Sequence, residues 1–145
     1  MRLSLIALAL VAAMTVAVFS ANDEELSRLI DRAQSASLDQ QARLYAEIAE
    51  REVKIADEMY TADKVPEGAA KVSDAVSYAD KASDAAIRSG KHLKDTEIAM
   101  RKMAAKLRDV RRKLSVEDEA SVIAAANHLE TLRTNLLSHM FKGKE

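Results

Sequence analysis

The sequence predicts an all-α protein that folds as an up-and-down helical bundle. The 145-residue chain contains one proline and three glycines, so it has few residues that interrupt a helix. Charged residues make up 31% of the chain, and Ala and Leu are abundant, as is typical of helical proteins. Apolar residues recur at helical spacing in four segments of similar length. Four matched helices with short connections favour an antiparallel bundle.

The first twenty residues form a separate unit. Arg2 gives a positive start, residues 3–19 carry no charge, and the acidic stretch NDEE follows at residues 22–25. This layout is typical of a secretory signal peptide, and we expect cleavage after Ser20. An uncleaved membrane anchor is the alternative, because seventeen uncharged residues lie at the short limit of a bilayer span.

The predicted organisation follows from this segment. It comprises a signal peptide at 1–20, a short N-terminal helical segment at 21–36, a bundle at 37–141 and a C-terminal tail at 142–145. The mature chain would contain 21 basic and 23 acidic residues, a formal net charge of −2. This balance predicts no nucleic-acid binding, and it predicts a membrane contact only if the first segment is retained. We expect a periplasmic or extracellular protein, with anchoring in the inner membrane as the alternative.

The first two long helices have local boundary signals. The helix at about Leu38–Ala62 follows Ser37, and Gln40 lies three residues further on, as in an N-terminal capping box. The helix at about Pro66–Ser89 has its proline in the first turn, where a missing N–H costs nothing. The stretch from Ala56 to Ala69 between them resembles the turn of a tetratricopeptide-type helical hairpin over less than one repeat of about 34 residues. The resemblance implies a helical hairpin there and no membership of that family.

The last two helices are predicted at about Lys91–Leu114 and Val116–Met140. Ser115 with Asp118 suggests a second capping box between them. At the three junctions between the long helices, basic residues precede acidic ones, which complements the helix dipoles on both sides. A shorter helical segment at Asp23–Ala33 has a small apolar face of its own.

Each helix has an apolar stripe that predicts the core. The second helix is unusual because its stripe consists mainly of alanine, which allows close backbone approach but buries little area. In the first helix Glu52 lies on or beside the stripe, and we expect its carboxylate to reach water. The stripe of the last helix alternates by three and four residues: Val122, Ala125, Leu129, Leu132 and Leu136.

The position of Gly90 decides between two shapes. Apolar residues from Val65 to Leu114 recur every seven positions without a change of phase across Gly90. A helix running through Gly90 would give an elongated dimeric helical rod with a continuous central helix. The charge reversal around Gly90 and the equal helix lengths favour a break and a compact bundle instead.

Three histidines and one basic run are the candidates for binding chemistry. His128 and His139 lie on nearly the same helical face, which suggests a haem- or metal-carrying bundle as an alternative function. We nevertheless expect His92, His128 and His139 to lie at the surface or at helix ends, and we expect no cofactor. The basic run comprises residues 101–114, and its candidate contacts to an acidic protein partner are Lys102, Lys106, Arg108 and Arg112. A solvated outer face is the plainer interpretation of this run.

The chain contains no recognisable arrangement for catalysis. It shows no nucleophile with a base and an orienting group, no glycine-rich phosphate loop and no carboxylate pair of defined geometry, so we expect no enzyme. The sequence therefore predicts an exported helical bundle that acts as a protein-binding or structural module in the bacterial cell envelope. A membrane-anchored scaffold is a further alternative, and a homodimer remains open.

Overall fold

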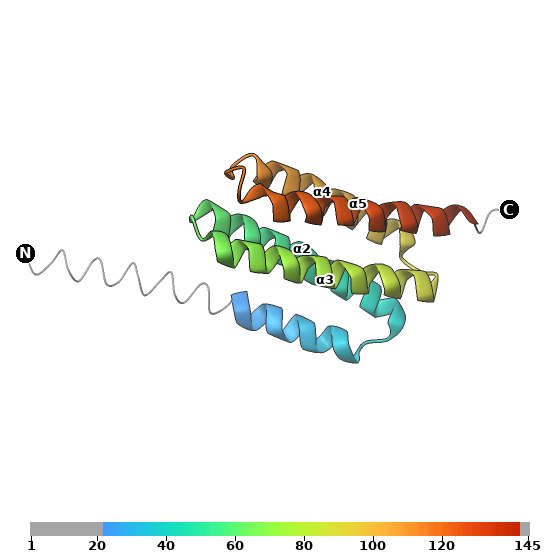
Figure 1. The fold of residues 1–145 in the computed structure, drawn as a ribbon. Coiled ribbons are helices and arrows are strands. Elements are labelled where there is room, and N and C mark those ends of the chain that lie inside the picture. Colours follow the sequence, from blue (N-terminus) through green and yellow to red (C-terminus); the bar gives the residue numbers. More distant parts are fainter. Residues whose placement is uncertain (1–21, 143–145) are drawn as a thin grey trace, which may run out of the picture.

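The structure is a computed structural model, and the part of the chain that it describes is residues 22–142. An N-terminal helix spans residues 22–35. Four longer helices follow: α2 (Leu38–Thr61), α3 (Val65–Ser89), α4 (Leu93–Arg111) and α5 (Glu119–Lys142). Successive helices run in opposite directions, so the all-α, up-and-down bundle is confirmed (Figure 1). The predicted signal peptide lies outside the described residues, and no helix within them is long and apolar enough to cross a membrane.

The bundle consists of two helical hairpins and one additional helix. Helix α2 packs along α3, and α4 packs along α5. The two hairpins stack so that α2 lies beside α4 and α3 lies beside α5, while the N-terminal helix forms a third tier on the side away from α4 and α5 (Figure 1). Leu26, Leu29 and Ala33 bury the apolar face of the N-terminal helix. Arg51 of α2 reaches this helix at Glu25, where Nη1 lies 2.8 Å from Oε1.

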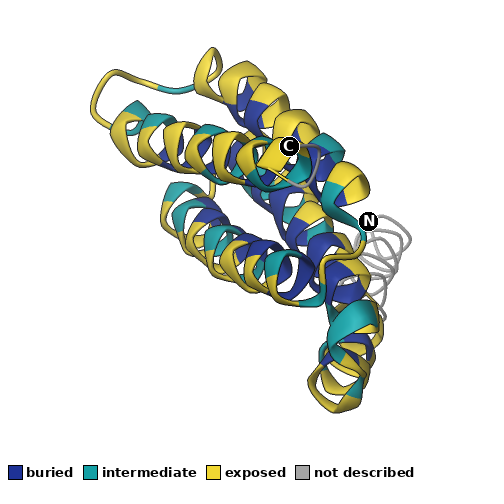
Figure 2. Ribbon diagram, turned by 90° about the vertical axis from the view of Figure 1, so that its right-hand side faces the viewer, coloured by how far each residue is buried: buried dark blue, intermediate teal, exposed yellow. Residues whose placement is uncertain are grey.

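Among the four long helices, α2, α4 and α5 contribute large side chains to the core, whereas α3 contributes mainly small ones. Buried residues line the inward faces of the helices (Figure 2). The predicted stripe of α5 lies in this core, with Val122, Leu129 and Leu136 buried. Helix α3 contributes chiefly alanine, as predicted from its sequence: Ala75, Ala79, Ala82, Ala85 and Ala86 are buried. These small side chains allow α2 and α3 to pack closely.

The helix breaks at Gly90, so the continuous rod is not formed. Gly90 has a φ of 69°, and its N–H donates to the carbonyl of Ala86 at 2.9 Å. A left-handed conformation of this kind commonly ends a helix, and glycine adopts it without the steric cost of a Cβ atom. The heptad phase persists across the break because α3 and α4 both face the same core, with Ala86 and Met100 fully buried on either side of it.

Two capping predictions have different outcomes. Ser37 caps α2, because its side chain accepts a hydrogen bond from the N–H of Gln40 at 3.4 Å. The other prediction is wrong in detail: α4 ends at Arg111 rather than Leu114, and α5 begins at Glu119 rather than Val116. Ser115 Oγ donates to the carboxylate of Asp118 at 2.9 Å instead of capping a free N–H. The pair of side chains thereby closes a turn, and residues 112–118, all predicted as helical except Ser115, form the connection.

Candidate functional site

Two of the four predicted partner-binding residues hold α4 against its neighbours. Lys106 Nζ lies 3.0 Å from Asp57 Oδ2 of α2, and Lys113 Nζ lies 3.0 Å from Oδ1 of the same carboxylate. Partial burial tends to raise the pKa of Asp57, but the hydrogen bonds and the positive charges of the two lysines together outweigh it and hold that pKa below its ordinary value. Arg108 contacts Glu130 of α5 at 3.2 Å. These contacts join α4 and the residues after it to α2 and to α5.

The contact of Arg108 belongs to a larger network between α4 and α5. Arg133 Nε donates to Glu97 Oε1 at 2.7 Å, and Arg133 Nη1 lies 3.3 Å from Glu130. The hydrogen bond that Arg133 donates to Glu97, followed by the one that it donates to Glu130, raises the pKa of Arg133. Glu97 is buried, so its charge needs this partner.

The other two predicted residues do not join helices through ion pairs. Arg112 contacts Asp109 one turn earlier in the chain at 3.5 Å, and both side chains are exposed. Lys102 is exposed and interacts electrostatically with Glu50 of α2. Lys102 and Arg112 are therefore the members of the predicted set that a partner reaches without breaking an ion pair between helices. Binding of an acidic protein by the four residues stays a prediction.

The structure gives each histidine of the haem or metal hypothesis a protein contact. His128 Nε2 lies 2.6 Å from Asp80 Oδ1 of α3, and both side chains are exposed. His139 Nδ1 lies 2.9 Å from the carbonyl oxygen of Asn135, one turn earlier in α5. Within residues 22–142, no three His, Cys, Asp or Glu side chains are grouped so as to hold a metal ion. The two histidines thus have local contacts in α5 and between α5 and α3.

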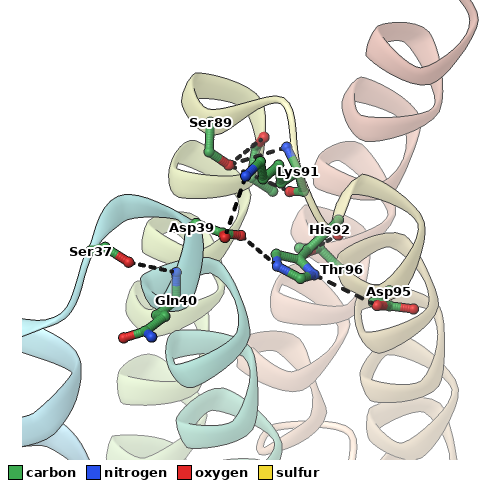
Figure 3. Close-up of polar contacts among 9 residues, drawn as sticks. Ser37, Asp39, Gln40, Ser89, Lys91, His92, Asp95 and Thr96 are labelled. Atoms are coloured by element: carbon green, nitrogen blue, oxygen red, sulfur yellow. Dashed lines mark hydrogen bonds and ion pairs between the residues drawn. The ribbon is translucent and has the colours of Figure 1, made fainter.

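His92 links the α3–α4 connection to the start of α2 (Figure 3). Its Nε2 lies 2.5 Å from Asp39 Oδ1, and Lys91 Nζ lies 3.7 Å from the other oxygen of Asp39. The carbonyl of His92 accepts hydrogen bonds from both the N–H and the hydroxyl of Thr96, at 2.9 and 2.7 Å. Sequence reasoning missed this cluster because no local pattern joins residues so far apart in the chain.

Glu52 is buried, contrary to the prediction that its carboxylate reaches water. Its side chain is 3% exposed, and Lys71 Nζ of α3 lies 3.3 Å from Oε2. Burial raises the pKa of Glu52, and Lys71 offsets this effect only in part. Asp74 and Asp23 raise the same pKa further. The correction arises because α3 and the N-terminal helix both pack against α2, which gives α2 a wider buried face than one apolar stripe predicts.

The outward face of α5 is the candidate binding surface. Its residues form a second stripe with the spacing of a coiled coil, alternating by four and three positions, and we call it the outer seam: Ala120, Ala124, Asn127, Thr131, Thr134, Ser138 and Phe141. All seven residues are exposed, and none carries a charge. The hydroxyls of Thr131 and Thr134 donate to carbonyls of their own helix, at 3.1 and 3.0 Å. Their methyl groups and the ring of Phe141, which is 59% exposed, give the seam apolar character.

The outer seam differs from the exposed surface of the neighbouring helix. The exposed positions of α4 carry mostly charged side chains, among them Arg101, Lys102, Lys106, Arg108 and Asp109. Sequence reasoning missed the seam, although its spacing is visible in the sequence, because the core stripe of the same helix has the same spacing.

Comparison of the chain with known protein families, curated proteins and solved structures finds no match.

Proposed function

We propose that this protein is an exported, non-enzymatic helical bundle that acts as a protein-binding or structural module in the bacterial cell envelope. The single observation that supports binding is the outer seam of α5. It is an uncharged, exposed helix face in a molecule whose adjacent helix α4 is densely charged on its exposed side. The cores of protein interfaces are similarly depleted of charged residues.

The seam is suited to burial because its polar groups are partly satisfied already. Covering a charged or unbonded polar group costs free energy unless the partner replaces the lost water contacts. Thr131 and Thr134 avoid part of this cost, since their hydroxyls already bond within α5. A partner can therefore cover these positions without supplying a hydrogen bond to each one.

A structural rather than catalytic role agrees with the placement of the buried carboxylates. Glu97 is engaged by Arg133, and Glu52 is engaged by Lys71. Each pair joins two helices of the bundle, so the ion pairs serve packing.

The export part of the proposal rests on the uncharged run at residues 3–19 and on the preceding Arg2. A retained segment would make the protein a membrane-anchored scaffold with the same binding face.

Site-specific photocross-linking in the producing cells tests the binding proposal. A photoreactive amino acid replaces Ala124 or Thr131 on the seam, and Ala105, an exposed alanine of α4, is the matched control position. We expect cross-linked adducts from the two seam positions and few or none from position 105. Absence of adducts at both seam positions contradicts the proposal.

Mass spectrometry of the same protein tests export, and we expect a chain that begins at or near Ala21.

A further inference from the structure

The outer seam has a symmetry that bears on the identity of its partner. Three of its positions lie 4, 7 and 11 residues before Thr131 and three lie 3, 7 and 10 residues after it, so the offsets in the two directions agree to within one residue. A second α5 laid antiparallel along the first would place Thr131 against Thr131. It would place Ala124 against Ser138, and Ala120 against Phe141. The largest side chain of the seam then faces one of its two smallest.

We propose that α5 pairs antiparallel with α5 of a second copy of this chain, in a twofold-symmetric dimer formed through the outer seams. The inference rests on the proposed function, because it names the partner of the same binding face. A twofold interface uses the same patch on both subunits, so the patch must be complementary to itself. The size pattern about Thr131 meets this requirement in the antiparallel orientation.

Charges at the two ends of α5 favour the same orientation. Glu119 begins α5, Glu117 and Asp118 directly precede it, and Lys142 ends it. Antiparallel pairing brings Lys142 beside the acidic start of the other α5, and it does so twice in a twofold dimer. The helix dipoles are then also antiparallel. A parallel arrangement would instead bring the two acidic starts together and set Phe141 against Phe141.

The dimer should be weak and dependent on concentration. Its central contact is one helix against one helix, which puts the buried area at the low end for specific complexes, below about 1,200 Å² in total. Thr131, Thr134 and Ser138 add methyl and methylene groups rather than large apolar side chains. We therefore expect a dissociation constant of the dimer on the order of micromolar.

Charge substitution at Thr131 tests the inference directly, because this residue meets its own copy across the twofold axis. The variants Thr131→Glu and Thr131→Lys are each compared with the wild-type protein by sedimentation equilibrium, from about 1 μM to about 1 mM. We expect the wild-type protein to dimerise and each variant to raise the dissociation constant at least tenfold through like-charge repulsion. An equimolar mixture of the two variants should dimerise again, because it brings Glu against Lys. Ala105→Glu on α4 is the matched control and should leave the dissociation constant unchanged.

The opposing outcomes separate this inference from the proposed function. A wild-type protein that stays monomeric to about 1 mM overturns the dimer, as does a dimer that Thr131→Glu leaves intact. A mixture of the Thr131 variants that dimerises no better than either alone also overturns it. Circular dichroism of each variant establishes that the fold is retained. Cross-links from position 124 to a different protein, together with a monomer in solution, overturn the second copy while the binding proposal stands. Absence of any adduct contradicts both.

Discussion

His92 joins the α3–α4 connection to the first turn of α2 through Asp39, with Nε2 of the imidazole 2.5 Å from Oδ1 of the carboxylate. Asp39 lies in the first turn of α2, and His92 immediately precedes α4. The contact therefore pins the parallel pair α2 and α4 at one end of the bundle (Figure 3). Asp57 with Lys106 and Lys113 performs the same task further along the two helices.

Removing the His92–Asp39 contact should destabilise the bundle modestly. His92 has a positive φ of 61°, so His92→Gly removes the side chain and relaxes the backbone at once. A double-mutant cycle of Asp39→Ala and His92→Gly isolates the contact from the backbone effect, and we expect a coupling of about 0.5–1 kcal/mol in urea unfolding. A coupling near zero would mean that the contact contributes nothing to stability. His92→Ala should be less stable than His92→Gly, because alanine keeps a Cβ at positive φ.

Gly90→Ala should destabilise the fold by about 1 kcal/mol. A Cβ at Gly90 would meet no atom within 4 Å, so the cost comes from the backbone at φ 69° alone. Gly90→Asn is the matched comparison, since asparagine tolerates this conformation better than other non-glycine residues, and it should cost less. The midpoint of chemical denaturation measures both changes. An increase in stability for Gly90→Ala would indicate a continuous helix in solution and contradict the break.

The features that could be predicted from the sequence are those with local signals. Gly90, Pro66 and Ser37 act within a few residues of themselves, so the helix breaks and one cap were recognised correctly. The contact of His92 with Asp39 depends on how the hairpins stack, and no local pattern contains that information. Helix α5 shows a further limit. It has two stripes of the same spacing, and only the packing shows which one faces water.

The burial of Glu52 likewise depends on packing beyond its own helix. A stripe on α2 predicts one buried face, whereas α3 and the N-terminal helix both pack against α2. Lys71, which neutralises Glu52 in part, comes from a different helix at no fixed spacing. The sequence could place Glu52 beside the stripe, but it could not show that its carboxylate is enclosed.

The stability of the protein should depend on pH through Glu52. Its pKa is raised in the folded state by burial, so the folded chain holds this proton more readily than the unfolded chain. The contribution of Glu52 to the free energy of unfolding is fully present below the ordinary carboxyl pKa and is lost as the pH rises through the raised value. Glu52→Gln keeps a neutral side chain at every pH. The stability of the wild-type protein relative to Glu52→Gln should therefore fall as the pH rises above the ordinary carboxyl pKa of 4.5.

Urea unfolding of both proteins across this pH range measures the effect. The same measurements on Glu58→Gln, at an exposed position of α2, give the background of removing one carboxylate from this helix. The expectation fails if the difference between the wild-type protein and Glu52→Gln stays constant or grows with pH.

Substitution of the four predicted partner-binding residues should separate a pair that stabilises the fold from a pair that does not. Lys106→Glu with Arg108→Glu sets new carboxylates against Asp57 and Glu130, which removes two ion pairs and introduces repulsion. We expect this double variant to lose about 1–2 kcal/mol of stability in urea unfolding. Lys102→Gln with Arg112→Gln breaks no ion pair between helices and sets no new carboxylate beside Glu50 or Asp109, so it should unfold within about 0.5 kcal/mol of the wild-type protein. The second variant therefore isolates binding from folding: if the basic run contacts an acidic protein, it should abolish capture of that protein at unchanged helicity. Capture that persists at moderate salt would show that Lys102 and Arg112 form only a solvated face, because exposed charge contacts weaken as salt screens them.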